Sequence, residues 1–427
     1  MSWPSREIGR PPQPSPRRGK LREVGPPPQP SPRRGEGVVV ILLWTALLHQ
    51  PAYAGDWSGD AGIELRAFGS SPLDPEQEDN NLSFYMQPEY YRDWDDDNQR
   101  FVVTPFLRID QADPERSHFD LRELYWRKSY PTMELSVGLK KIFWGVTESA
   151  HLVDIINQTD AVENVDTEDK LGQPMINLTL VRDWGTVDLF LMPWFRERTF
   201  PSLEGRLRPP FYIDESRAQY ESSAREKHID VAARWTHYFG DWDIGLAHFS
   251  GTSREPTLQF IQSVTGLTVF PFYDQIEQTS LDLQLTKGSW LWKLESFNRS
   301  GQGESFQALA AGFEYTLVGV RDSTLDLGLI AEYLRDNRKL GTSVSDQDIA
   351  TGFRLAFNDV QSTELLAFTG IDLNNNERFS SIEGSRRLGQ SWKISLEARF
   401  FSNTEPDSTL HSLRDDDYLQ LSLAKYF

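Results

Sequence analysis

The chain has 427 residues, of which 38% are hydrophobic and 25% charged, with a formal net charge of -19 and a mean hydropathy of -0.51. It contains 13 Trp, 14 Tyr and 25 Phe but no Cys, which excludes disulfides, thiolate metal sites and cysteine nucleophiles. The acidic excess argues against a nucleic-acid partner, because phosphate binding requires clustered Lys and Arg, and the lack of any run of about 18 apolar residues excludes a bundle of membrane helices.

Residues 1–37 form a leader that is rich in Pro and Arg. Residues 6–19 recur almost unchanged as residues 22–35, sixteen positions later. The Pro content prevents regular helix or sheet, so the segment cannot build a core. It is either a disordered basic leader or repetitive DNA that is translated because the start codon was placed too far upstream. The abrupt, nearly perfect duplication favours the second interpretation.

Residues 38–54 have the features of a signal peptide. An eleven-residue apolar run, 38–48, follows two arginines and precedes a small-x-small sequence at 52–54. The run is too short to span a bilayer as a helix. We predict cleavage after Ala54, which leaves an exported chain, 55–427, whose lack of Cys suits an envelope protein. Because eight basic and three acidic residues precede Gly55, the net charge of this chain is -24.

From residue 55 onward, apolar and polar residues alternate with a period of two, the pattern of β-strands. In residues 392–400, for example, the apolar side chains occupy the even positions and the charged or hydroxyl side chains the odd ones. Eighteen strands are predicted, with sixteen as the nearest alternative. Their ranges are 57–68, 81–92, 99–110, 118–129, 132–143, 174–183, 185–196, 227–239, 241–251, 275–287, 289–299, 305–317, 323–335, 347–358, 361–372, 377–388, 390–402 and 417–427.

The connections between these strands differ systematically in length. Even-numbered strands are followed by tight turns, such as 183–185 and 240–241, whereas odd-numbered strands are mostly followed by longer polar loops. The longest of these loops are 144–173, 197–226, 252–274, 336–346 and 403–416. Short periplasmic turns at one end and long extracellular loops at the other are typical of an outer-membrane barrel. We therefore predict an all-β fold for residues 55–427, a transmembrane antiparallel up-and-down β-barrel in the outer membrane of a Gram-negative bacterium, in contact with lipid and lipopolysaccharide.

The chain end and the aromatic residues support the same fold. Residues 418–427 alternate and finish on Phe427, an ending that resembles those of outer-membrane proteins recognised by the bacterial barrel-assembly machinery. Aromatic residues also gather beside the predicted periplasmic turns and the first strand start, where a barrel carries an interfacial girdle. They are Trp57, Trp94, Tyr130, Trp184, Trp242, Trp290 and Trp392.

Three short sequences resemble a family of large, mostly uncharacterised proteobacterial outer-membrane barrels, which are similar in turn to porin-like and alginate-export-type barrels. They are Arg-Glu-Leu-Tyr at 122–125, Gly-Leu-Lys-Lys-Ile-Phe-Trp-Gly at 138–145 and Asp-Ile-Ile-Asn at 154–157. The family's middle sequence usually reads G-R-Q-x-x-x-W-G and is followed by D-x-x-N-P-x-D. Here Leu139 and Lys140 replace the Arg-Gln pair, and Gln158 stands where the Pro is expected. The resemblance covers residues 122–160 and implies envelope transport without a defined substrate.

Strand residues that face away from lipid are the polar members of each alternation, and they predict a lumen lined by charges of both signs. Two interpretations stay open, and both can hold for the same residues. The charges orient and select small polar solutes in a water-filled lumen, or they pair with one another and rigidify the wall. The candidate pore-lining residues are Arg108, Arg122, Glu134, Lys140, Arg234, Lys293, Glu295, Arg354, Glu397 and Arg399.

The loop 144–173 is among the longest, and its segment 151–157 is more apolar than a solvated loop requires. We predict that this loop folds inward as a constriction. Its candidate residues at the narrowest point are Glu148, His151, Asp154 and Asp160. The alternative is a surface cap that packs on the neighbouring loops.

The predicted function is that of a passive, porin-like outer-membrane channel for small polar solutes, as a monomer or a homotrimer, with no metal and no cofactor. One alternative is a structural or adhesive surface barrel whose lumen is plugged by its loops. Another is an exporter of an acidic polymer, which predicts a continuous basic stripe that the mixed charges do not form. An enzyme is not expected, because the seven His residues are accompanied by no Gly-x-Ser-x-Gly or His-Glu-x-x-His sequence.

Overall fold

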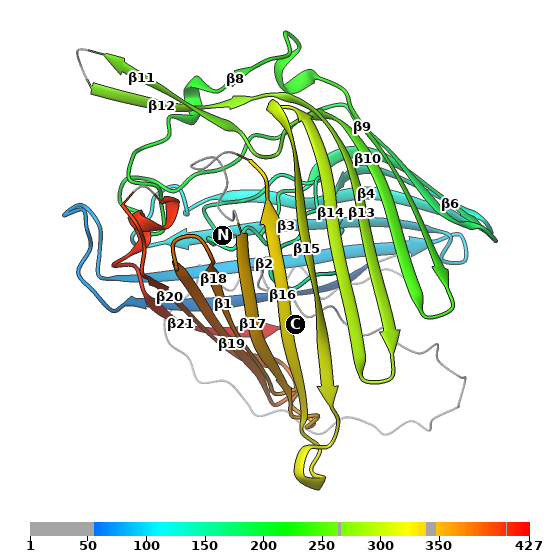
Figure 1. Cartoon of the computed structure of the whole chain (residues 1–427). Helices are drawn as coiled ribbons and strands as arrows, with labels where there is room; N and C mark the ends of the chain where they lie inside the picture. The colour runs from blue at the N-terminus through cyan, green and yellow to red at the C-terminus, as the bar shows by residue number, and fades with distance from the viewer. Residues whose placement is uncertain (1–54, 264–265, 339–346, 407) are drawn as a thin grey trace, which may run out of the picture.

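The structure is a computed structural model that describes residues 55–427 except 264–265, 339–346 and 407. The predicted leader and signal peptide lie outside the described residues. Eighteen antiparallel strands form one sheet, which closes into a barrel because β1 pairs with both β2 and β21 (Figure 1). The strands are β1 (Asp56–Phe68), β2 (Asn80–Trp94), β3 (Gln99–Asp110), β4 (Phe119–Tyr130), β5 (Met133–Lys140), β6 (Gln173–Arg182), β7 (Gly185–Met192), β9 (Asp230–Phe239), β10 (Trp242–Thr252), β13 (Gln275–Lys287), β14 (Trp290–Gly301), β15 (Gly303–Leu317), β16 (Asp326–Asp336), β17 (Gln347–Ala356), β18 (Glu364–Asp372), β19 (Arg378–Leu388), β20 (Trp392–Ser402) and β21 (Tyr418–Tyr426). The prediction of an eighteen-stranded up-and-down barrel is confirmed.

The strand boundaries agree with the sequence pattern to within a few residues, with two informative differences. The fifth strand was predicted to reach residue 143 and the seventh to reach residue 196, but β5 ends at Lys140 and β7 at Met192. In both places the apolar pattern continues beyond the strand, because Ile142, Trp144 and Phe195 are shielded by protein rather than by lipid.

The two ends of the barrel differ as the connection lengths predict. At one end, two-residue turns such as 240–241 and 288–289 join neighbouring strands, and Gly240 and Gly288 supply the left-handed backbone that these turns require, each with φ of 60°. At the other end lie the long connections. They contain a small sheet of β8 (Gln219–Tyr220), β11 (Thr257–Ser263) and β12 (Gly266–Tyr273), which was predicted only as polar loop. The β11–β12 hairpin projects beyond the wall (Figure 1).

Successive side chains point alternately to lipid and to the interior. On β2, Leu82 and Phe84 are exposed on the outer surface, whereas Ser83 between them is buried inside. A bulge at Thr104 and Pro105 shifts the β3–β4 register. As a result Arg122 is 4% exposed while Leu124 on the same strand is 38% exposed, although both are even-numbered.

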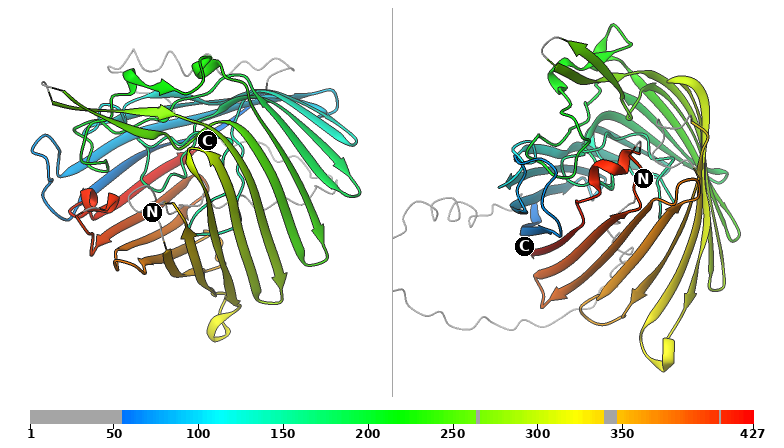
Figure 2. Two further views of the ribbon diagram at one scale, coloured as in Figure 1. Left: turned by 45° about the horizontal axis from the view of Figure 1, so that its top comes forward. Right: turned by 60° about the vertical axis from the view of Figure 1, so that its left-hand side comes forward.

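The wall of strands curves around the interior (Figure 2). Its outer surface carries many exposed apolar side chains, such as Ile63, Leu246 and Leu421. Of the seven aromatic residues expected in a girdle, Trp94 is partly buried and the other six are exposed. Among the described residues the helices are short 3-10 segments: η3 (Glu215–Arg217), η4 (Arg225–Lys227), η5 (Val320–Asp322) and η6 (Thr409–Leu413). Within the part of the chain that the structure describes, none of the helices is long and apolar enough to cross a membrane.

Candidate functional site

The interior of the barrel holds the connection between β5 and β6, residues 141–172, named here the lumenal loop. It binds inward-facing side chains of strands that are far apart on the wall, from β3 and β4 to β14, β16, β17 and β20. The predicted constriction loop, 144–173, is therefore inside the barrel rather than on its surface. The loop is anchored by two apolar clusters and by several charged groups.

The first apolar cluster joins the lumenal loop to the wall from β6 to β13. Trp144, Val153, Ile155 and Ile156 supply the loop side of this cluster. Val153 and Ile156 have no exposed surface, and burying such a side chain fully contributes about 1.5–3 kcal/mol. The wall side consists of Met175, Phe190, Met192, Ala232, Ala247, Phe249 and Ile276.

The second apolar cluster lies on the wall from β15 to β20. Ala150, Leu152 and Val165 of the lumenal loop contact it, and Leu410 and Leu413 of η6 cover it from the loop end. Its wall residues are Ala310, Ile330, Leu334, Ala350, Leu366, Phe368, Phe379 and Phe401. The expectation that inward positions are the polar members of each alternation is wrong for these two clusters. They are apolar because protein covers them instead of water.

Glu295 on β14 fixes the first part of the lumenal loop. Its Oε1 accepts hydrogen bonds from the backbone N–H of Val146 at 2.5 Å and of Thr147 at 2.8 Å, and from the Thr147 hydroxyl at 2.9 Å. Its Oε2 accepts a bond from the backbone N–H of Val153 at 3.1 Å. One wall carboxylate therefore accepts four hydrogen bonds from the lumenal loop. Three come from Val146 and Thr147, and the fourth comes from Val153.

Glu148 of the lumenal loop contacts charged side chains of β14, β16 and β17. Its Oε2 is 3.4 Å from Lys293 Nζ on β14 and 2.9 Å from an Arg354 guanidinium nitrogen on β17. The backbone N–H groups of Glu148 and Ser149 donate to Glu332 on β16, at 2.8 and 2.7 Å. Three strands on the same side of the wall, β14, β16 and β17, are thus cross-linked through two loop residues.

A second set of ion pairs binds the later part of the lumenal loop to β3, β4 and β20. Asp160 Oδ2 lies 2.6 Å from Arg122 of β4, and Glu163 Oε2 lies 2.7 Å from Arg108 of β3. On β20, Arg399 is fully buried and pairs with loop residue Asp166 at 3.1 Å. The Asn164 side chain donates to Glu397 of the same strand at 3.1 Å.

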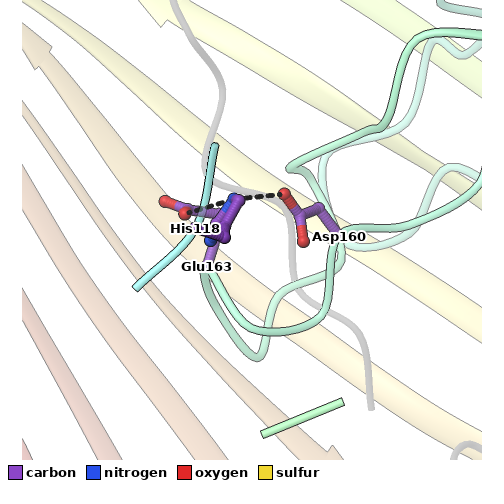
Figure 3. A group of neighbouring side chains, drawn as sticks. All are labelled: His118, Asp160 and Glu163. Atoms are coloured by element: carbon purple, nitrogen blue, oxygen red, sulfur yellow. Dashed lines mark ion pairs between the residues drawn. The ribbon is translucent and has the colours of Figure 1, made fainter. Parts of the chain in front are cut away.

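His118, Asp160 and Glu163 form the one group among the described residues whose spacing could suit a metal ion (Figure 3). His118 Nε2 lies 3.5 Å from Asp160 Oδ2 and 3.6 Å from Glu163 Oε1. The same carboxylates are already bound by Arg122 and Arg108, so a cation would have to displace two guanidinium groups. The group therefore fits an ion-pair network better than a metal site.

The charges of this network shift the pKa values of two of its members, Asp160 and His118. Burial opposes ionisation of Asp160, but the contact with His118 at 3.5 Å and the charges of Arg122 and His118 hold its pKa well below the usual range. Burial likewise opposes protonation of His118. The contact with Asp160 and the charges of Asp160 and Glu163 outweigh it and raise the His118 pKa.

His151 of the lumenal loop, like His118, lies between two carboxylates. Its Nε2 is 3.4 Å from Glu168 Oε1, and its Nδ1 is 3.9 Å from Glu295 Oε1. Burial opposes protonation of His151, but Glu295, Glu168 and Asp154 together raise its pKa. Burial raises the pKa of Glu168 to about 8 and also raises that of Asp154, which Lys170 at 3.5 Å only partly offsets.

The structure brings most of the sequence-predicted site residues together around the lumenal loop. Arg108, Arg122, Lys293, Glu295, Arg354, Glu397 and Arg399 contact it directly. Arg234 pairs with Asp282 at 2.8 Å and lies over the loop's Trp144 ring. Lys140 is 3.5 Å from Asn177, and Glu134 pairs with Arg127 at 3.7 Å, away from the loop.

A cavity of about 150 Å³ remains in the interior against β17–β21. Its polar lining combines residues that were predicted, Arg354 and Glu397, with others that were not, Glu364, Glu383 and Lys393. The alternation in residues 392–400 places Lys393 on the inner face and could have identified it. The anchoring residues Glu163 and Asp166 gave no such signal, because acidic residues in a loop are usually solvated.

Comparison with protein-family models gives no match, and no curated protein matches the chain. Among solved structures, the chain is similar to a BenF-like porin from Pseudomonas fluorescens, with 10% identity and a TM-score of 0.51, over 88% of this chain and 97% of that chain. It is also similar to Wzi, an outer-membrane protein involved in group 1 capsule assembly in Escherichia coli, with 9% identity and a TM-score of 0.49, over 86% of this chain and 84% of that one. A mutant of the Rh. blastica porin gives 10% identity and a TM-score of 0.43, over 87% and 100%. At these identities the likeness concerns the fold, which is that of a porin-like outer-membrane barrel.

Proposed function

We propose that the protein is a porin-like channel of the bacterial outer membrane in which the lumenal loop narrows the passage and restricts it to small hydrophilic solutes. The observation that carries this proposal is the attachment of residues 141–172 to strands on different sides of the lumen. An eighteen-stranded barrel without such a loop is wide enough to leave an aqueous channel. The loop therefore determines what passes.

The same proposal includes the route to the membrane. Export requires the signal peptide at 38–54, and insertion uses Phe427, whose exposed ring at the end of the last strand is accessible to the barrel-assembly machinery. The apolar outer surface then faces lipid, with lipopolysaccharide at the loop end. The chain acts as a monomer or a homotrimer and catalyses no reaction.

A second candidate, a structural barrel closed by its loops, is favoured by the two apolar clusters. Packing of the kind found around Val153 and Phe401 normally belongs to a permanent core rather than to a water-filled passage. An exporter of an acidic polymer has less support, because Lys293, Arg354 and Arg399 of the interior are paired with carboxylates rather than aligned as a free basic stripe.

Planar-bilayer conductance separates these functions. The wild-type protein is compared with a variant lacking residues 148–166 and with a control that lacks residues 261–268 at the end of the β11–β12 hairpin, which leaves the buried Val269 and Phe270 in place. The channel proposal predicts that wild type conducts, that the loop deletion raises conductance several-fold and that the hairpin deletion changes nothing. If the wild-type protein does not conduct but the loop deletion does, the barrel is closed by its loop. If all three proteins conduct equally, the loop is not a constriction.

A further inference from the structure

The interior cavity against β17–β21 is formed by a row of small side chains. Ser385 on β19 is opposite Ser395 on β20, and Ser395 is opposite Ser422 on β21. All three face the interior and line the cavity of about 150 Å³. Since one water occupies about 30 Å³ of liquid, the cavity has room for about five waters or one solute of similar volume. The row also presents three hydroxyl groups to whatever is bound.

On the loop side of the serine row, the charged residues already have partners. Arg354 binds Glu148 of the lumenal loop at 2.9 Å, and Glu383 binds Arg399 at 2.8 Å. Glu397 accepts bonds from Asn164 and from the Tyr418 hydroxyl. These groups line the part of the cavity nearest the lumenal loop, and their charges are compensated within the protein.

Two charged residues that line the same cavity form no ion pair within 4 Å among the residues that the structure describes. Glu364 on β18 accepts one hydrogen bond, from the Ser385 hydroxyl at 2.8 Å, and its electrostatic neighbour is Arg354, which Glu148 already pairs at 2.9 Å. Over the same residues Lys393 on β20 has no ion pair. Both side chains are half-buried, so a solute can reach them. Their strands are separated by two strand spacings, about 10 Å.

We propose that this cavity is a binding site for a small zwitterion of amino-acid size, with its carboxylate on Lys393 and its ammonium group on Glu364. Ser385 on β19 and Ser395 on β20 line the same cavity, and their hydroxyls complete the hydrogen bonding. A neutral polyol would leave both protein charges unpaired, and a simple anion would leave Glu364 unpaired, so each would gain less from binding. This assignment rests on the proposed function, because it names the class of solute that the channel would select.

Ligand-detected NMR titration of the full-length protein in detergent micelles tests the site without requiring conduction. The probes are L-alanine, glycerol and propionate. Wild type is expected to bind alanine at least tenfold more tightly than glycerol or propionate. Equal binding of all three probes, or none of alanine, would overturn the proposal, and this comparison needs no variant.

Two substitutions locate the site. Lys393→Gln and Glu364→Gln should each weaken alanine binding about tenfold, the effect expected when one charge-assisted hydrogen bond becomes neutral. Lys287→Gln, at the exposed end of β13, is the matched control and should bind as wild type does. Variants that retain wild-type alanine affinity would refute the assignment. If the protein binds alanine but never conducts, the channel proposal fails and the binding site stands. If the protein conducts but does not bind alanine, the channel proposal stands and the binding site is refuted.

Discussion

Replacing Glu295 by Gln tests whether the lumenal loop is held by a single wall carboxylate. The variant keeps the shape of the side chain but removes its charge and converts one oxygen to an NH₂ group. The amide oxygen can still accept the bonds from Val146 and Thr147, whereas the NH₂ group would face the N–H of Val153. One bond is therefore lost outright and the others become neutral.

The magnitude follows from these contacts. Hydrogen bonds to a charged group contribute about 1.5–3 kcal/mol and neutral ones about 0.5–1.5 kcal/mol. Removal of the charge also relieves the cost of burying a carboxylate, which offsets part of the loss. We expect the bound state of the loop to lose about 2–3 kcal/mol, a factor of about 30–150 in its local opening equilibrium.

Hydrogen–deuterium exchange measured by mass spectrometry on the folded protein checks this value. Peptides that cover residues 146–153 should lose protection by that factor, while peptides from β1 and β2 should not change. Glu134→Gln, an interior glutamate without contact to the loop, is the matched control. If exchange in the loop changes less than threefold, or changes equally in both variants, the anchoring role assigned to Glu295 is wrong.

Three further predictions concern the lipid-facing wall at Leu421, the ion pair between Asp166 and Arg399, and the effect of pH on the lumenal loop. Leu421→Lys on the lipid-facing side of β21 should lower the free energy of unfolding in vesicles by about 2–4 kcal/mol, and a loss below about 0.5 kcal/mol in urea titrations would contradict the assigned orientation. Asp166→Asn should leave the buried Arg399 with Glu383 and Glu397 only, so we expect a loss of about 1–3 kcal/mol in the same titration and increased exchange in residues 160–168. The raised pKa values of Glu168, about 8, and of His151 favour their protonated forms when the loop is in place, so protection of the loop, corrected for the intrinsic exchange rate, should fall as the pH rises from 6 to 9. Glu168→Gln should flatten that dependence, and protection that increases with pH would refute the argument.

The sequence by itself determined the barrel. Whether a strand residue meets lipid or the interior is a local property, repeated every two residues, so the alternation in residues 392–400 could be read without knowing any partner. In the same way, the lengths of the connections indicated which end of the barrel carries the short turns and which end carries the long loops. The inward folding of the lumenal loop also had a local sign, in the apolar residues at 151–157.

Only the tertiary structure decided which interior residues act together. Glu134 and Glu295 occupy equivalent inward positions in their strands, yet only Glu295 binds the loop, and its partners Val146 and Thr147 are about 150 residues away in the sequence. Phe368 and Phe401, which face inward, are buried in a core because they pack in one cluster with Ala150 of the same loop. Lys393 and Glu364 line the same cavity as the loop-bound Arg354, yet neither forms an ion pair within 4 Å among the described residues, because residues of the lumenal loop contact Arg354 and Glu397 instead. A period of two assigns each side chain to a face, but closure of the barrel and the path of one loop within it determine whether that side chain meets water, a counter-ion or a core.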